Sequence, residues 1–222
     1  MIELNWLLFT FLLAAVPFGQ IVARYLADVD LRTAGSGNIG ATNVARVVGK
    51  PAGLVTLVLD VAKGLLPVMG ATWLSTEPAF WGLVGLTAVL GHCFTPYLRW
   101  RGGKGVATSL GVLVGLVPWV ALGGLVAWLL GVGLSRRSSV GALIALPTVV
   151  VLAALWSPPL VGWVVAIAGV VALRHTSNIG RLLAGRELGV DQLSSKETVT
   201  AGGAGTAGGA GTAGGAGTAG QS

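Results

Sequence analysis

Residues 106–134 read VATSLGVLVGLVPWVALGGLVAWLLGVGL, an apolar stretch of 29 residues without a charged side chain. A helix that crosses a membrane needs about 20 residues, so this stretch is too long for one ordinary span. It contains Pro118 and the glycine pair Gly123-Gly124. One long tilted helix and two short helices folded as a hairpin both agree with its length, and the choice sets the number of membrane crossings.

The rest of the chain has the composition of a membrane protein. Of its 222 residues, 54% are hydrophobic and 10% are charged, and the mean hydropathy is +0.82. A soluble domain carries about 25% charged residues, so this chain has too little polar surface for a water-soluble globule. Further apolar runs cover residues 4–25, 52–74, 80–98, 140–156 and 158–173. The composition predicts an all-α, polytopic membrane protein.

The positive charges decide between the two folds of 106–134. Thirteen of the fourteen Lys and Arg residues fall in four clusters: Arg24, Arg32, Arg46 and Lys50; Arg99, Arg101 and Lys104; Arg136 and Arg137; and Arg174, Arg181, Arg186 and Lys196. The turns at 75–79 and 156–159 have none. The positive-inside rule puts all four clusters in the cytoplasm, so 106–134 must go out and come back. This predicts seven transmembrane helices, with the N-terminus outside and the C-terminus cytoplasmic.

We expect a membrane-embedded domain at 1–190 and a cytoplasmic tail at 191–222. Within the tail, residues 201–220 repeat the hexad AGGAGT three times and add AG, a composition that predicts disorder. The first residues, MIELNW, lack the basic start of a signal peptide. Cys93 is the single cysteine, so no intrachain disulfide is expected, and a buried small residue is favoured over a nucleophile.

A dinucleotide fingerprint, G-x-G-x-x-G, occurs in GSGNIGATN at 35–43, and Asp60 follows Gly40 by twenty residues. A Rossmann unit, however, alternates strand and helix, whereas this stretch lies between two membrane-length apolar runs. The match is therefore not taken to indicate nucleotide binding.

Three polar stretches instead share a different chemistry. They are GSGNIGATNVAR at 35–46, RGGKGVATS at 101–109 and RHTSNIGRLLAGRE at 174–187. All three combine small residues with hydroxyl, amide or cationic donors, and the predicted topology brings them to one membrane face. Backbone N–H groups in Gly-rich loops and at helix N-termini bind anions. Acidic pairs with the spacing of a Mg²⁺ cluster are missing from the sequence, so a metal-free phosphate site is predicted.

The chain resembles the bacterial membrane-embedded glycerol-3-phosphate acyltransferases that use acyl phosphate as donor. The similarity runs from Val16 to Glu187. It includes PFG at 17–19, DLR at 30–32, DVAKG at 60–64, GHCF at 91–94 and the three polar stretches, in the family's order and spacing. Departures are Thr95-Pro96, where the proline is expected directly after GHCF, and Arg186, where a small residue is common.

The resemblance implies seven transmembrane helices in the cell inner (plasma) membrane, with a cytosolic active site. The implied reaction is the first acylation of phospholipid synthesis. Acyl phosphate and sn-glycerol 3-phosphate give 1-acyl-glycerol 3-phosphate, or lysophosphatidic acid, and phosphate. Neither cofactor nor metal nor nucleic acid is expected to take part. A monomer surrounded by membrane lipid is compatible with the sequence, which does not specify an oligomeric state.

Candidate site residues follow from these stretches. The catalytic candidates are Ser36, Arg46, Lys104, His175 and Asn178. The candidates for binding substrate or phosphate are Gly35, Gly37, Asn38, Asn43, Gly102, Gly103, Gly105, Thr108, Arg181 and Glu187. Their structural alternatives are helix caps and turns for the Ser and Asn side chains, and anchors at the inner membrane face for the cations.

Charged and titratable side chains within the apolar runs have mainly structural interpretations. Asp60 and Lys63 should face the protein interior, because each ion at a bilayer centre costs about 2.5–3.5 kcal/mol, and their spacing allows an ion pair. His92 fits a structural role and a substrate contact equally well. The proton of the attacking hydroxyl could go to His175 or to a substrate phosphate, and the phosphate is favoured.

Two rival functions remain. A membrane transporter of a phosphorylated solute also needs apolar spans and a cationic site, but it usually shows internal repeats and a site at the midplane. A CDP-alcohol phosphotransferase would need an acidic metal cluster that the sequence does not supply.

Overall fold

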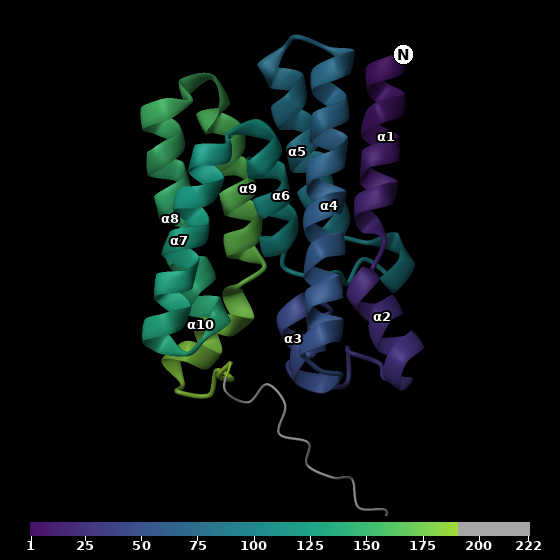
Figure 1. Cartoon of the computed structure of the whole chain (residues 1–222), viewed down its shortest axis with the longest axis vertical. Helices are drawn as coiled ribbons and strands as arrows, with labels where there is room; N and C mark the ends of the chain where they lie inside the picture. The colour runs from purple at the N-terminus through teal and green to yellow at the C-terminus, as the bar shows by residue number, and fades with distance from the viewer. Residues whose placement is uncertain (191–222) are drawn as a thin grey trace, which may run out of the picture.

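The computed structural model describes residues 1–190, and all regular secondary structure in that range is helical (Figure 1). The elements are α1 (Ile2–Ala15), α2 (Phe18–Ala27), α3 (Ala41–Val47), α4 (Lys50–Leu74), α5 (Pro78–Cys93), the 3₁₀ turn η1 (Pro96–Leu98), α6 (Val106–Leu116), α7 (Pro118–Ser135), α8 (Ser138–Trp156), the 3₁₀ turn η2 (Pro158–Leu160), α9 (Val161–Leu173) and α10 (Thr176–Leu183). The predicted disordered tail at 191–222, with its repeats, lies outside the described residues.

The stretch 106–134 forms two helices, α6 and α7, rather than one. Val117 between them is not helical, with φ −149° and ψ 75°, and Pro118 is the first residue of α7. Proline suits this position, because its fixed φ is helical and the first N–H of a helix has no intrahelical partner. Figure 1 shows the chain turning back between them, so the two-helix alternative is confirmed. α6 packs mainly on α4, and α7 packs mainly on α8.

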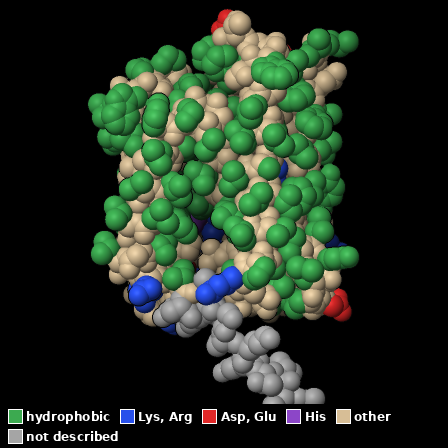
Figure 2. Space-filling view, viewed as in Figure 1, with side chains coloured by type: hydrophobic (Ala, Val, Ile, Leu, Met, Phe, Trp, Pro, Cys, Tyr) green, Lys and Arg blue, Asp and Glu red, His purple; other side chains and the backbone are tan. Residues whose placement is uncertain are grey.

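Five segments within residues 1–190 are long and apolar enough to cross a membrane. They are Ile2–Ala27, Lys50–Leu74, Pro78–Leu98, Pro118–Ser135 and Ser138–Trp156. A sixth results if the pair Pro158–Leu173 and Thr176–Leu183, bent by 54°, is one broken span, and α6 is a shorter apolar helix. Figure 2 shows hydrophobic side chains over most of the visible face, with most visible Lys and Arg near the lower end.

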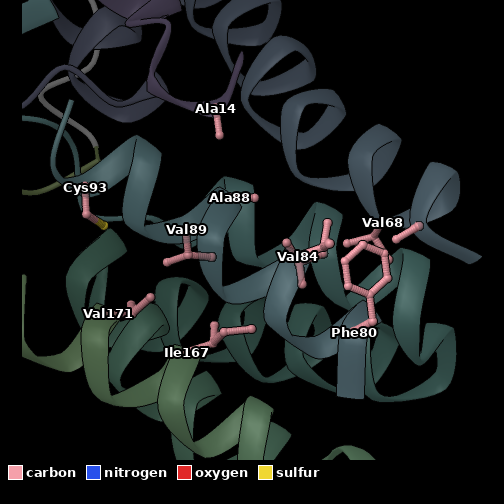
Figure 3. Close-up of a cluster of buried hydrophobic side chains, with 11 residues drawn as sticks. Ala14, Val68, Phe80, Val84, Ala88, Val89, Cys93, Ile167 and Val171 are labelled. Atoms are coloured by element: carbon pink, nitrogen blue, oxygen red, sulfur yellow. The ribbon is translucent and has the colours of Figure 1, made fainter. Parts of the chain in front are cut away.

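The main core lies where α1, α4, α5, α6 and α9 meet. Val84, Ala88 and Val89 of α5 are fully buried there, beside Val68 of α4 and Val171 of α9 (Figure 3). Most of these side chains are small, which lets apolar helices approach closely. A second cluster joins α6, α7, α8 and α9 around Leu113, Ala121, Val149 and Val164.

Glycines set the contact between α4 and α6. A Cβ at Gly64 would collide with the backbone carbonyl of Thr108, and one at Gly111 would collide with that of Val61. The two helices therefore touch backbone to backbone, which only glycine permits at both positions. This contact fixes the start of α6, and with it the loop that precedes α6.

The predicted intramembrane ion pair is present. Lys63 Nζ lies 2.9 Å from Asp60 Oδ1, and the two side chains are 2% and 3% exposed. Lys63 also donates a hydrogen bond of 2.8 Å to the carbonyl of Val16, at the break between α1 and α2. The pair thus compensates its own charge, and Lys63 is a second donor to the Val16 carbonyl, which also accepts a hydrogen bond of 3.0 Å from the N–H of Phe18. Cys93 is a free and fully buried cysteine, as expected.

Candidate active site

One cavity of about 510 Å³ brings the three polar stretches together. Its wall includes Ser36, Asn38, Asn43 and Arg46 from the first stretch, Lys104 and Gly105 from the second, and His175, Asn178, Arg181 and Glu187 from the third. Segments separated by more than a hundred residues therefore share one space. In Figure 2 the face is hollowed in its lower half, and Lys or Arg side chains are visible inside the hollow.

The first stretch is organised by Asn43 of α3. Its side-chain oxygen accepts a hydrogen bond of 2.8 Å from the backbone N–H of Ser36, and its amide donates to the carbonyls of Ala34 and Asn38 at 3.0 and 2.8 Å. The chain reverses tightly here, because Gly35 and Gly37 have φ of 58° and 74°. Asn43 is 1% exposed. It therefore holds the loop in shape as well as lining the cavity, whereas Gly35 and Gly37 form the turn and are not on the wall.

Arg46 projects from α3 into the same space. Its Nη1 donates 3.2 Å to Asn43 Oδ1 and its Nη2 donates 3.3 Å to the carbonyl of Gly189. Burial lowers the pKa of Arg46, and the nearby Glu187 carboxylate opposes that effect. A guanidinium stays charged in proteins over the usual pH range, so Arg46 contributes a fixed cation to the cavity.

Lys104 supplies a second cation of a different kind. Burial lowers its pKa to about 8, with Glu187 acting to raise it and Arg181, Arg174 and Arg46 acting to lower it. The Lys104 ammonium makes no ion pair within residues 1–190. Partial burial without a counter-ion is costly, so the site favours an anion beside Lys104.

Of the residues near Lys104 in the sequence, some line the cavity and others pack against neighbouring helices. Gly105, with φ 86°, lines the cavity and starts α6. Gly102 and Gly103 do not line it, because they pack against His92 and Cys93 at the end of α5, where an added Cβ would collide with both. Thr108 is fully buried against α4 and is also absent from the wall. The sequence predicts that Gly102, Gly103 and Thr108 bind substrate or phosphate. This stays a prediction, and none of the three lines the cavity.

The third stretch presents one helical face. His175 is the N-cap of α10, and Asn178 and Arg181 follow at intervals of three residues, so all three face the cavity. Glu187 accepts hydrogen bonds from Asn178 Nδ2 and, at 2.8 Å, from Arg181 Nε. Burial acts to raise the pKa of Glu187, but the polar side chains of Ser139, Asn178 and Arg181 near the carboxylate outweigh it, so the pKa is lowered. Glu187 is thus a carboxylate that holds two donors, Asn178 and Arg181, at the cavity wall.

The sequence did not single out several polar residues of the wall. These are Ser109 of α6 and Ser138 and Ser139 at the start of α8. Asp60, which the sequence analysis assigned to an ion pair with Lys63, lines the cavity too. His92 also lines it, 4% exposed, with Nδ1 at 3.7 Å from Asp60 Oδ1. The helix-start serines follow the cluster Arg136-Arg137, and that position after a predicted turn was the only local signal for them.

An apolar arm extends from the polar part of the cavity. Its lining comes from four helices: Leu110 and Leu113 of α6, Ala121 to Val132 of α7, Ala142 to Val149 of α8, and Val164 to Val171 of α9. The arm ends at the second core cluster. The cavity therefore joins a cationic pocket to an apolar channel among the helices, a shape that suits a ligand with a phosphate head and a hydrocarbon tail. Among residues 1–190, no three His, Cys, Asp or Glu side chains gather around a possible metal site.

The chain is similar to known proteins over most of its length. The sequence model of the family glycerol-3-phosphate acyltransferase matches residues 4–185. A glycerol-3-phosphate acyltransferase of Pseudomonas syringae pv. syringae is 45% identical over 189 residues, covering 84% of this chain and 98% of the relative. One from Anaeromyxobacter is 44% identical over 185 residues, covering 80% and 91%.

Two solved structures have the same fold. The crystal structure of PlsY, an integral membrane glycerol 3-phosphate acyltransferase, in its glycerol 3-phosphate form superposes with a TM-score of 0.81 at 34% identity, covering 85% of this chain and 96% of that one. Its lysophosphatidic acid form superposes with a TM-score of 0.79. This likeness, together with the apolar helices, identifies a multi-pass membrane protein. The chain belongs to the glycerol-3-phosphate acyltransferase family.

Proposed function

We propose that this protein transfers an acyl group from acyl phosphate to sn-glycerol 3-phosphate, giving 1-acyl-glycerol 3-phosphate and inorganic phosphate. The observation that carries the proposal is the cavity itself, in which Arg46, Lys104 and Arg181 lie at one end and an apolar arm leads away from them. Both substrates carry a phosphate, and one of them also carries a hydrocarbon chain. The two parts of the cavity match these two features.

The cations overcome the repulsion between the reactants. Two phosphorylated molecules must lie side by side for the reaction, and like charges at such distances repel strongly in a partly buried site. Arg46 and Arg181 are held by neighbouring groups, whereas Lys104 makes no ion pair within residues 1–190. Burial lowers the pKa of Lys104 to about 8, so a further negative charge beside it would stabilise its ammonium. A bound phosphate supplies that charge.

The reaction needs no nucleophile from the protein. Acyl phosphate is an activated anhydride, so the glycerol hydroxyl oxygen attacks the carbonyl carbon, and the bond from that carbon to the phosphate oxygen breaks. Phosphate leaves with the electron pair. Cys93 is fully buried and absent from the cavity wall, in keeping with this scheme. In this scheme Ser36, which lines the cavity, donates a hydrogen bond to the carbonyl oxygen as that oxygen gains charge.

Proton removal has two candidate acceptors. His175 Nδ1 lies 2.8 Å from the carbonyl of Val171, and since a carbonyl only accepts, Nδ1 carries the proton and Nε2 is the free acceptor. Burial lowers the pKa of His175, which keeps the ring neutral near neutral pH. A phosphate oxygen of the substrate can take the proton as well, and we favour it because the two substrates are already in contact.

We further propose a topology of seven spans in the inner (plasma) membrane, with α6 as a short span, the N-terminus outside and the cavity open to the cytoplasm. Support comes from the positive clusters near α3, α10 and the α7–α8 turn, at the end of the molecule away from the N-terminus (Figure 1). Near the opposite end, Trp73, Trp119 and Trp156 are 90%, 77% and 65% exposed. Exposed tryptophans at helix ends are typical of a membrane interface.

A direct assay separates this function from its rivals. Purified protein is incubated with palmitoyl phosphate and glycerol 3-phosphate, and phosphate release and lysophosphatidate are measured. Palmitoyl-CoA replaces the acyl phosphate in a parallel reaction, which should give no product. A transporter would instead move labelled glycerol 3-phosphate into proteoliposomes without forming lysophosphatidate, and that result would refute the proposal.

A further inference from the structure

Gly102 and Gly103 lie directly before Lys104, and every backbone N–H and C=O group of these two glycines has a hydrogen-bond partner. The N–H groups of Gly102 and Gly103 donate to the carbonyls of Cys93 and His92, at 3.2 and 3.1 Å. These two carbonyls belong to the last turn of α5, which has no intrahelical donors for them. The end of α5 therefore holds one edge of the glycine segment.

Arg174 holds the other edge. Its Nη2 donates 2.9 Å to the carbonyl of Gly102 and its Nε donates 3.1 Å to the carbonyl of Gly103. The same guanidinium lies 5.4 Å from the ring centre of Phe94, which adds a cation–π contact. All four polar backbone groups of the two glycines are thus satisfied, two by α5 and two by one arginine.

The position of Arg174 couples this loop to a second part of the site. Arg174 ends α9, and the next residue is His175, whose ring lines the cavity. The Arg174 side chain reaches the segment before Lys104, which lines the same cavity. One residue therefore ties the backbone of the second polar stretch to that of the third.

We propose that Arg174 is a positioning residue, which fixes Lys104 relative to His175 by clamping the carbonyls of Gly102 and Gly103. It rests on the proposed function, since Lys104 is taken to bind substrate phosphate. The guanidinium of Arg174 donates from two nitrogen atoms to two successive carbonyls. A lysine ammonium has a single nitrogen atom and does not reproduce this two-point geometry. Arg174 itself is absent from the cavity wall, so its effect on substrate passes through Lys104 and His175.

The test compares Arg174→Gln and Arg174→Lys with Arg101→Gln. Arg101 precedes the same glycines and is exposed, with no side-chain hydrogen bond within residues 1–190, so its variant controls for charge. For Arg174→Gln we expect kcat/KM for glycerol 3-phosphate to fall by up to about a hundredfold, because a small displacement of catalytic groups is costly. Arg174→Lys should recover only part of this loss, and Arg101→Gln should stay near wild type.

A second readout separates positioning from general destabilisation. Glycerol 3-phosphate binding is measured calorimetrically against pH, where the charged groups facing Lys104 are Glu187, Arg181, Arg174 and Arg46. Arg174→Gln removes one cation that repels the Lys104 ammonium and releases the loop before Lys104. The pH at which glycerol 3-phosphate binding is half lost should therefore rise by about half a pH unit or more. The inference is overturned if Arg174→Gln keeps both the wild-type pH midpoint of binding and the wild-type kcat/KM. It is also overturned if Arg101→Gln lowers kcat/KM as much as Arg174→Gln does. If the wild-type protein bound no glycerol 3-phosphate, the proposed function would fail instead.

Discussion

Blocking the apolar arm should change the acyl-chain preference of the enzyme. Along α8 the cavity wall runs from Ser139 to Val149, which is ~15 Å at about 1.5 Å of rise per residue. An extended chain of roughly twelve carbons has that length, at about 1.3 Å per carbon along a zigzag of ordinary C–C bonds. Ala145 lies four residues before Val149, or ~6 Å nearer the polar end. Ala145→Phe should therefore remove space for about five carbons.

The size of the effect comes from strain and not from lost burial. A long acyl phosphate reaches the site from lipid, so moving its tail into the arm gains little hydrophobic free energy. A blocked tail must displace core side chains or leave the arm, and overpacking of a core costs about 1–3 kcal/mol. This corresponds to roughly a fivefold to hundredfold change in relative kcat/KM. An octanoyl chain fits in the remaining space and should be nearly unaffected.

The assay measures kcat/KM for palmitoyl and octanoyl phosphate with saturating glycerol 3-phosphate. Wild type, Ala145→Phe and Val151→Phe are compared, because Val151 is on the same helix but is 56% exposed on the outer surface. We expect the palmitoyl-to-octanoyl ratio to fall in Ala145→Phe alone. An unchanged ratio, or an equal fall in Val151→Phe, would show that the acyl tail does not lie in the arm.

Three further predictions concern the charged groups. With the pKa of Lys104 at about 8, the protonated fraction of its side chain falls about tenfold between about pH 7 and about pH 9. The affinity for glycerol 3-phosphate, measured by calorimetry, should therefore weaken about tenfold over this range. The variant Lys104→Arg should bind glycerol 3-phosphate without this pH dependence. Lys63→Met leaves the Asp60 carboxylate buried without its ion-pair partner. This variant should lower the free energy of unfolding, measured with denaturant on the purified protein, by about 3–5 kcal/mol. The double variant Asp60→Leu with Lys63→Met should recover most of that loss. His175→Gln should lower the rate but keep the shape of the rate–pH profile if a substrate phosphate takes the proton; loss of the ascending limb would assign the base to His175.

Much of the fold could be predicted from the sequence, because the relevant signals are local. Apolar runs of membrane length give helices wherever lipid surrounds them, since no other structure satisfies the backbone of each segment alone. Pro118 marks the break between α6 and α7, and the spacing of His175, Asn178 and Arg181 already indicates one helical face. The convergence of three distant stretches followed from charge asymmetry combined with the number of crossings.

The role of each site residue was harder to predict. Gly102 and Gly103 have the composition of a phosphate loop, yet their open sides face His92 and Cys93 of α5 and not the cavity. The backbone carbonyl of Thr108 lies in the contact with Gly64 of α4, and the residue is fully buried. Small residues are required both where a ligand approaches and where two backbones touch, so residue type alone does not distinguish these cases.

The sequence by itself determined that the chain is helical and lies in a membrane, and it located three polar stretches rich in small residues and cations, because hydropathy, charge and proline positions act on their own neighbourhood. Only the tertiary structure decided which of these groups share a cavity, that Asn43 and Glu187 orient other donors, and that Arg174 clamps the loop before Lys104. Those facts depend on contacts between segments far apart in the sequence, such as the hydrogen bond from Arg174 to Gly102, 72 positions away. Such contacts are set by how whole helices pack, and no local pattern records that packing.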